Sequence, residues 1–382
     1  MDSFDQFAKM AWEFIQDVCV IQSFLALIWL LLPKYWKEKL KVFICRSKKV
    51  AINEESKLGK MLLNDIKLFT GVDRDCNIIF IVDRSPLNIP NDLLLISKRL
   101  ENENNDRAAN GESPVYTDLH PYAVHRIFVN RKPTERNEKP ECTVYIKESS
   151  FFHSLITISA LDEVVGNTTV RKKYYSALIN NPENASPDGY DIVHAFGLNT
   201  MVLTKDGFFV FAKRNINTVS TAGGCIHMSV GEHLNDDVLD YSSDGKPSAI
   251  KSIVKGIHQE LGVDISDEDK ANIHFYAVGF AKSVCQYGAL GFVHLSSVTS
   301  IELRDKWNLS KDGCYESEEI IFIDASIQEI VKYLNEHPND SMTKFALLNA
   351  CLALMMEPEL GNISQTKIEK ELGNLRKGAL VG

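Results

Sequence analysis

The sequence predicts an α/β fold for the C-terminal half of this 382-residue chain, from three observations. First, residues 193–204 and 207–214 are two apolar segments joined by Lys205-Asp206-Gly207, a combination typical of a β-hairpin. Second, residues 248–261 place their apolar side chains on one helical face, and Gly262 follows at the C-cap position. Third, three later segments are strand-like, namely 275–280, 290–295 and 320–323. Strands that alternate with a helix in this way indicate an α/β domain, which we place at residues 190–382.

A smaller α/β module is expected ahead of this domain, over residues 51–185, and its role cannot be read from the sequence. Its strand candidates are residues 77–82 and 143–147, and residues 93–100 are expected to form a short helix. Residues 101–114 are polar and contain Gly and Pro, which predicts a loop or linker. Two further segments look helical or mixed, 151–165 and 170–179, and 342–356 is expected to be an apolar helix packed on the C-terminal domain or on a partner.

The N-terminal residues 1–50 predict a membrane anchor. Val18–Leu32 contains no charged residue, and extending it to residues 12–33 gives about 30 Å of helix, enough to cross a bilayer. Residues 1–17 carry a net charge of −3 and residues 33–50 carry +6. The positive-inside rule then predicts a single-pass inner-membrane protein whose later domains are cytoplasmic. The alternative is an amphipathic helix that lies on the membrane or is buried in an oligomer.

The composition of the remaining chain limits its partners. The whole chain carries −9, so residues 51–382 carry −12, and this acidic balance argues against binding to bulk nucleic acid. The basic run at 34–49 is better suited to anionic lipid head groups. Eight cysteines without a Cys-x-x-Cys pair are consistent with a reducing cytoplasm and no zinc ribbon. His227, His233 and His258 likewise lack the short fixed spacing of a zinc motif.

A degenerate motif carries most of the functional information. Gly224 precedes Glu232, and after an insertion of about fifteen residues a helix carries Lys255, Glu260 and Gly262. This order resembles the Nudix box, a loop-helix-loop that holds Mg²⁺ against a substrate diphosphate. The resemblance implies a Nudix-like α/β/α sandwich with a mixed sheet. It also implies three glutamates on the helix, but their positions are occupied by Gly256, Gln259 and Glu260, so only one carboxylate remains.

The resemblance assigns roles to individual residues. If the site is active, Glu232 and Glu260 are the catalytic and Mg²⁺-binding residues, and Asp236 or Asp237 from the acidic insertion is a replacement ligand; the alternative is that the insertion is a solvated turn. The residues expected to bind the ligand are Gly223, Gly224, Lys213, Arg214 and Lys255.

Three functions are compatible with these features. The first is a membrane-anchored sensor, in which the degenerate domain binds a nucleotide or nucleoside-diphosphate-type ligand without efficient hydrolysis and signals to the membrane helix, as a homo-oligomer. By analogy alone, this resembles effectors of bacterial nucleotide-messenger antiviral defence systems. The second is an active Mg²⁺-dependent Nudix hydrolase tethered to the membrane. The third is an interaction protein in which the fold is a bare scaffold.

Overall fold

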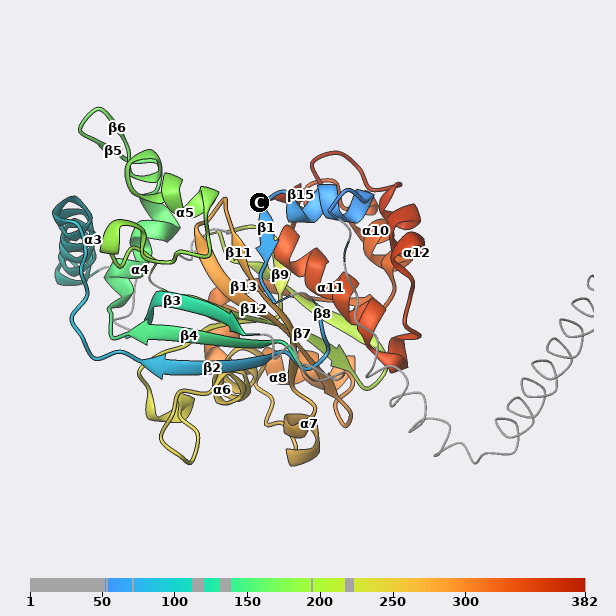
Figure 1. The fold of residues 1–382 in the computed structure, drawn as a ribbon. Helices are drawn as coiled ribbons and strands as arrows, with labels where there is room; N and C mark the ends of the chain where they lie inside the picture. The colour runs from blue at the N-terminus through green and yellow to red at the C-terminus, as the bar shows by residue number, and fades with distance from the viewer. Residues whose placement is uncertain are drawn as a thin grey trace, which may run out of the picture. The chain divides into compact units, whose positions relative to one another are not determined.

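The computed structural model of the chain describes residues 52, 54–70, 72–111, 120–130, 139–193, 195–216 and 223–381, which belong to one compact unit (Figure 1). The strands are β1 (Ile66–Leu68), β2 (Asn77–Val82), β3 (Ala123–Asn130), β4 (Glu141–Lys147), β5 (Val164–Val165), β6 (Thr168–Thr169), β7 (Phe196–Thr204), β8 (Phe208–Arg214), β9 (Ile226–Met228), β10 (Val230–His233), β11 (His274–Ala281), β12 (Gln286–Leu295), β13 (Ser317–Asp324), β14 (Met342–Thr343) and β15 (Leu380–Val381). The helices are α3 (Asn91–Ala109), α4 (Phe151–Ser159), α5 (Ser176–Asn180), α6 (Ala249–Leu261), α7 (Asp267–Ala271), α8 (Ser300–Trp307), α9 (Lys311–Glu316), α10 (Ile327–Glu336), α11 (Lys344–Met356) and α12 (Gln365–Leu372). Shorter turns are the π-helical η1 (Gly59–Leu63) and η2 (Arg171–Tyr175) and the 3-10 turns η3 (Pro187–Gly189), η4 (Val238–Asp240) and η5 (Pro358–Leu360).

A ten-stranded mixed sheet forms the centre of this unit, in the order β1-β11-β12-β7-β8-β9-β14-β15. Two strands lie off this path, because β10 pairs with β7 and β13 pairs with β8. The first half of β7 pairs with β10, and only Val202 and Leu203 near its end pair with β8. The sheet therefore forks between β8 and β10. The mixed α/β class expected from the sequence is confirmed.

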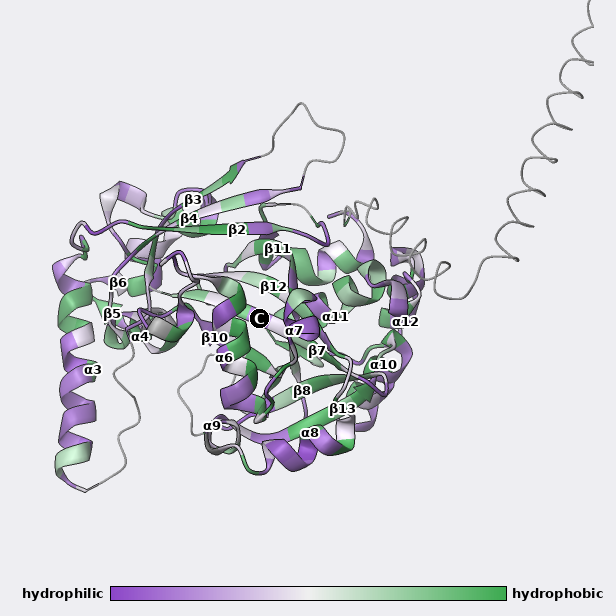
Figure 2. Ribbon diagram, turned by 90° about the horizontal axis from the view of Figure 1, so that it is seen from below, coloured by the Kyte–Doolittle hydropathy of each residue, from purple (hydrophilic) through white to green (hydrophobic). Residues whose placement is uncertain are grey.

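Helices cover the two faces of the sheet. Along β7, Leu198 and Val202 pack into the same core cluster as α6, whereas Met201 and Leu203 pack into the cluster that contains α10 and α11. This alternation follows from the period of two along a strand. Since both faces are covered, the middle of β8 is apolar on both sides, and β8 and β13 are largely green in Figure 2.

A second sheet of three strands, in the order β2-β4-β3, shares the core on the α6 side. β2 runs parallel to β4, and β3 runs antiparallel to it. Phe80 of β2 makes an edge-to-face contact with Phe196 of β7, with ring centroids 5.5 Å apart. In both ribbon views β2 is the strand of this sheet closest to α6 (Figures 1 and 2).

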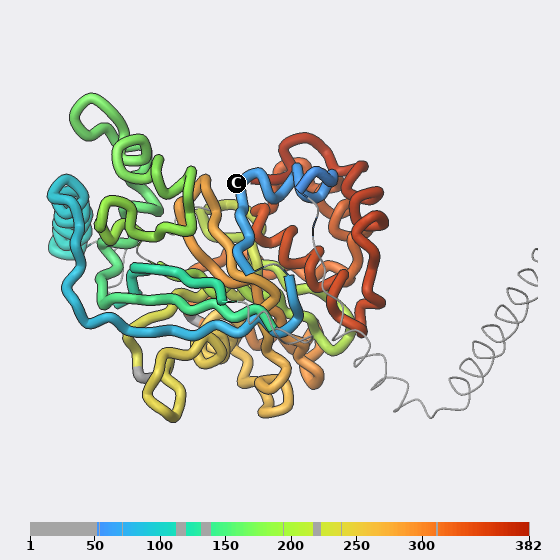
Figure 3. Tube along the Cα trace, in the orientation of Figure 1, coloured from blue at the N-terminus to red at the C-terminus, as the bar shows by residue number. Residues whose placement is uncertain are grey.

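The beginning and the end of the described chain pack together, as the blue and red segments of Figure 3 show. The side-chain amide of Gln365 donates to the Ser56 hydroxyl at 2.9 Å, and the Leu58 backbone N–H donates to Glu369 at 3.4 Å. These contacts hold η1 against α12. β1 then continues into the main sheet by pairing with β11.

Most elements lie where the sequence predicts them, with one clear exception. α6 begins after the cap Ser248 and ends at Gly262, whose φ of 68° is in the left-handed region that glycine tolerates. Residues 101–109, predicted as loop, instead continue α3. The reason is that Leu100 and Asn104 extend the buried stripe of this helix by one turn, while the polar residues between them face solvent.

The predicted localisation needs correction. Within the described parts of the chain, no helix is both long enough and apolar enough to cross a membrane, so the structure does not support a single-pass membrane protein. The proposed span at residues 12–33, and the whole of residues 1–50, lie outside the described residues.

Candidate functional site

The glutamates of the motif meet where the sheet forks. Glu260 of α6 is buried, and its carboxylate accepts a hydrogen bond from the Gly231 backbone N–H of β10 at 3.1 Å. Arg214, the last residue of β8, donates to the carboxylate of Glu316 at the end of α9, with 2.5 Å between Nη1 and Oε2. The fork therefore brings three glutamates, Glu232, Glu260 and Glu316, into the electrostatic range of one arginine.

Gly256 leaves the space that the Glu232 side chain occupies. A Cβ atom added at Gly256 would overlap the Glu232 side chain and would lie 3.0 Å from Val230 Cγ1. α6 thus approaches β10 so closely that only glycine fits at this position of the helix. The glutamate that the Nudix pattern expects here has no room in this packing.

Burial changes the charge state of the two motif glutamates. Burial raises the pKa of the Glu232 carboxyl to about 7, although Lys255 opposes this rise. Burial, reinforced by the charge of Glu316, raises the pKa of Glu260 well above its ordinary value. Because the two groups lie in one cluster, they titrate as a pair. Near neutral pH this pair retains protons, and protonated carboxyls are poor ligands for Mg²⁺.

The acidic insertion is tied to the rest of the unit by its own carboxylates. Lys255 Nζ lies 2.7 Å from Asp240, and these side chains are only 8% and 0% exposed. The Asp236 carboxylate accepts hydrogen bonds from the hydroxyls of Tyr122 and Tyr241 at 2.9 and 2.7 Å. Over the described ranges, no set of three or more His, Cys, Asp or Glu side chains is arranged to hold a metal ion. The donor set present does not fit Mg²⁺ in this arrangement.

The expected ligand-binding residues divide into a turn and a basic pair. Gly224 has a φ of 74° and donates its backbone N–H to the Arg214 carbonyl at 2.9 Å, so this glycine turn lies beside the end of β8. Lys213 points away from Arg214 and pairs with Asp340 at 3.0 Å and with Glu318 at 3.3 Å. The residues between 216 and 223 lie outside the described part of the chain.

Two histidines whose spacing does not fit a zinc motif, His227 and His233, lie at the fork. Burial lowers the pKa of His227 to about 3 and that of His233 to about 4, and nearby Arg214 lowers both further. His233 Nε2 lies 2.9 Å from the Gln286 side-chain nitrogen. His227 lines a cavity of about 40 Å³ together with Gln286 and Asn199. No spacing signal in the sequence could have indicated these neighbours, because they come from β7, β9, β10 and β12.

Comparison with known proteins assigns the chain to no family. No family model matches it, and no curated protein matches it. The resemblance to the Nudix superfamily is therefore not supported and needs correction: the box lacks the carboxylates that define the motif, and two extra residues separate Gly224 from Glu232. Among solved structures, DR0079 from Deinococcus radiodurans aligns with a TM-score of 0.26 and 10% identity, covering 37% of this chain and 74% of that one. A likeness at this level carries no argument.

Proposed function

We propose that the fork binds a nucleotide or nucleoside-diphosphate-type ligand without efficient hydrolysis. The observation that carries this proposal is the burial of Glu232 and Glu260, which raises both pKa values and keeps protons on groups that would have to be ionised to hold Mg²⁺. Glu260 is in addition occupied by the Gly231 N–H. Binding without turnover is the behaviour that suits a sensor.

Arg214 is the cation of the fork that would contact a diphosphate. It pairs with Glu316, which is 39% exposed. A ligand phosphate offers arginine the same bidentate geometry as a carboxylate and carries more charge. The ligand would therefore displace Glu316 from Arg214, whereas Lys213 points to the other side and stays paired with Asp340 and Glu318.

Displacement of Glu316 supplies a route from binding to output. The pair between Arg214 and Glu316 fastens α9 to the end of β8, and the Asn215 backbone N–H donates to the Glu316 carbonyl at 2.9 Å beside it. Release of the first contact weakens the attachment of α9, a short helix on the surface of the unit. A ligand that binds more tightly when α9 is released than when it is attached would then shift α9 towards release.

Calorimetric titration of the full chain with a panel of nucleoside mono-, di- and triphosphates, with and without Mg²⁺, tests this proposal when the same mixtures are assayed for phosphate cleavage. We expect binding without cleavage, and about tenfold weaker binding by Arg214→Lys, because lysine keeps the charge but cannot make the bidentate contact. Arg99→Lys is the matched control, since Arg99 also pairs with glutamates, Glu103 and Glu163, but lies on α3. Absence of binding by any member of the panel would refute the proposal.

An Mg²⁺-dependent hydrolase is the second candidate, because Glu232 and Glu260 do converge at the fork. A metal ion can displace protons from carboxyl groups when it binds. Turnover that depends on Mg²⁺ and is abolished by Glu260→Gln in a folded protein would favour the hydrolase over the sensor.

A further inference from the structure

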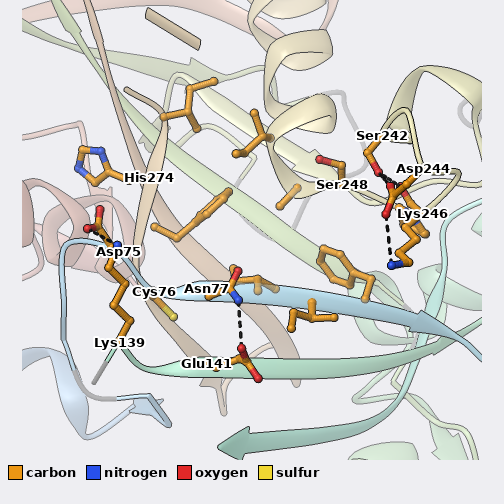
Figure 4. A pocket seen from close by; sticks show the side chains of 18 of the residues that line it. Asp75, Cys76, Asn77, Lys139, Glu141, Ser242, Asp244, Lys246, Ser248 and His274 are labelled. Carbon is orange, nitrogen blue, oxygen red and sulfur yellow. Dashed lines mark hydrogen bonds and ion pairs between the residues drawn. The ribbon is translucent and has the colours of Figure 1, made fainter. Parts of the chain in front are cut away.

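A groove lies away from the fork, at the opposite end of α6. Its volume is about 810 Å³. One wall is residues 75–80, which include the start of β2, and the other wall is residues 242–250, which include the insertion and the first turn of α6. Residues 273–275, at the start of β11, form the floor between these two walls. Figure 4 shows Asn77 and Glu141 on the strands of one side and Ser242, Asp244, Lys246 and Ser248 on the other.

The wall formed by β2 presents unused backbone groups. Within the described residues, β2 pairs with β4 alone. The Asn77 N–H donates to Pro140 at 2.9 Å and the Asp83 N–H to Ile146 at 2.7 Å, so the odd-numbered residues of β2 bond to β4. The N–H and C=O groups of Ile78 and Phe80 therefore point to the other side, into the groove. Neither residue makes a backbone hydrogen bond to any other described segment.

This edge lacks the usual protection against strand pairing. Natural edge strands carry lysine, proline or a bulge, or are covered. β2 (Asn77–Val82) has the sequence Asn-Ile-Ile-Phe-Ile-Val, with neither a charged residue nor a proline, and its pairing with β4 has no bulge. An apolar strand with free donors and acceptors along an open groove is the receptor side of β-strand addition. We propose that an extended peptide segment of a partner protein adds to β2 as a further strand.

The shape of the groove selects a single strand rather than a second copy of this chain. A strand added to β2 would lie about 4.8 Å from it. If the added strand were β2 of a second copy, the sheet of that copy would follow directly behind it, into residues 242–250. This wall is fixed, because the buried pair between Lys255 and Asp240 joins the insertion to α6. Six residues of β2 and its approach line the groove, so the bound segment spans about 20 Å.

The charges in the groove define the partner further. Asp75 pairs with Lys139 at 2.9 Å and Asp244 with Lys246 at 3.2 Å, so both lysines are already neutralised. Glu141 accepts a hydrogen bond from the Asn77 side chain at 3.2 Å and has no cationic partner among the described residues. The groove therefore carries one net negative charge. It fits a segment that is largely apolar and has one lysine or arginine beside Glu141, and it does not favour a phosphate ligand.

A labelled peptide library tests this proposal on the full chain. The probe is a set of fluorescein-labelled hexapeptides in which β-branched residues alternate with variable positions and one position is lysine, and binding is read by fluorescence polarisation. The best binder is then synthesised with N-methyl groups on alternate amides, in the two possible registers. We expect about tenfold or greater loss of affinity in one register and little change in the other, because only one set of amides faces β2.

The variants and the alternative outcomes keep the proposal falsifiable. Glu141→Gln should reduce the preference for the lysine-containing peptide over its alanine analogue, whereas Glu268→Gln, a change at an exposed residue of α7, should not. Absence of any binder, or equal losses in both N-methyl registers, would overturn strand addition. If the peptide is released when the protein self-associates, the edge of β2 pairs with a second copy of the chain. If nucleotides release the peptide, the groove binds nucleotides. Either result would overturn the proposal.

Discussion

Replacing Glu232 by glutamine should make the protein more stable at alkaline pH. The folded-state pKa of this carboxyl, about 7, is raised above the ordinary value of 4.5, so the folded protein holds the proton more tightly than the unfolded chain. The favourable contribution of this proton is complete below the unfolded pKa and is lost as the pH rises through about 7. The difference between the two pKa values, at about 1.4 kcal/mol for each unit, corresponds to about 3 kcal/mol. Glutamine resembles the protonated side chain in shape and has no charge to bury.

Urea unfolding of both proteins between about pH 4 and about pH 8 measures this effect. We expect equal stabilities at the acid end and an advantage of about 3 kcal/mol for Glu232→Gln at the alkaline end. The pKa values of His227 and His233 are lowered, so these histidines make the folded protein less stable as the pH falls below about 6.5, in both proteins alike. The quantity to compare is therefore the difference in the free energy of unfolding between the two proteins at each pH. Glu268→Gln, at an exposed position, serves as the control. Parallel pH profiles for the wild type and Glu232→Gln would show that Glu232 is ionised normally and would refute the account of the fork.

Three further changes test the packing around α6 and the core, each by chemical denaturation. Gly256→Ala should destabilise the protein by about 1–3 kcal/mol although alanine is the better helix former, because the new methyl group meets Glu232; adding Glu232→Ala should restore most of the loss. Lys255→Met should cost about 3–5 kcal/mol by leaving the Asp240 carboxylate buried and unpaired, and adding Asp240→Asn should recover a large part. Glu357→Gln should cost a similar amount, because the buried Glu357 carboxylate contacts the side chains of Arg74, His274 and Tyr276. A loss below about 1 kcal/mol would contradict this expectation.

The sequence predicts the elements around the fork because their signals are local. The hairpin turn at Lys205–Gly207, the Ser248 cap and the Gly262 C-cap each act through the backbone of neighbouring residues, so a short window contains the whole cause. The helical stripe of α6 is likewise local. Residues 101–109 were predicted as loop because most of them are polar. They are the exposed face of α3, and this becomes apparent only when the buried residues Leu100 and Asn104 are considered together with the earlier part of the helix.

The contacts that define the site could not be predicted, because they join residues far apart in the chain. Arg214 meets Glu316 across 102 positions, and Tyr122 meets Asp236 across 114. Gly256 is informative only when the position of Glu232 beneath it is known; from the sequence it reads as a lost ligand. The open edge of β2 is equally invisible, because a strand pattern does not state which neighbours the strand will have.

Lys255 joins the acidic insertion to α6. The sequence suggested that this residue would contact a ligand, but its side chain reaches Asp240 of the insertion instead. Its pair with Asp240 is buried, and a buried pair forms only where the surrounding geometry holds both groups. The Ser248 N–H also donates to the Asp240 carbonyl at 2.8 Å, so the insertion and the first turn of α6 form one wall. An insertion that seemed suited to replacing metal ligands thus uses its buried aspartate to build the side of a groove, while Glu232 and Glu260 remain buried at the other end of the same helix.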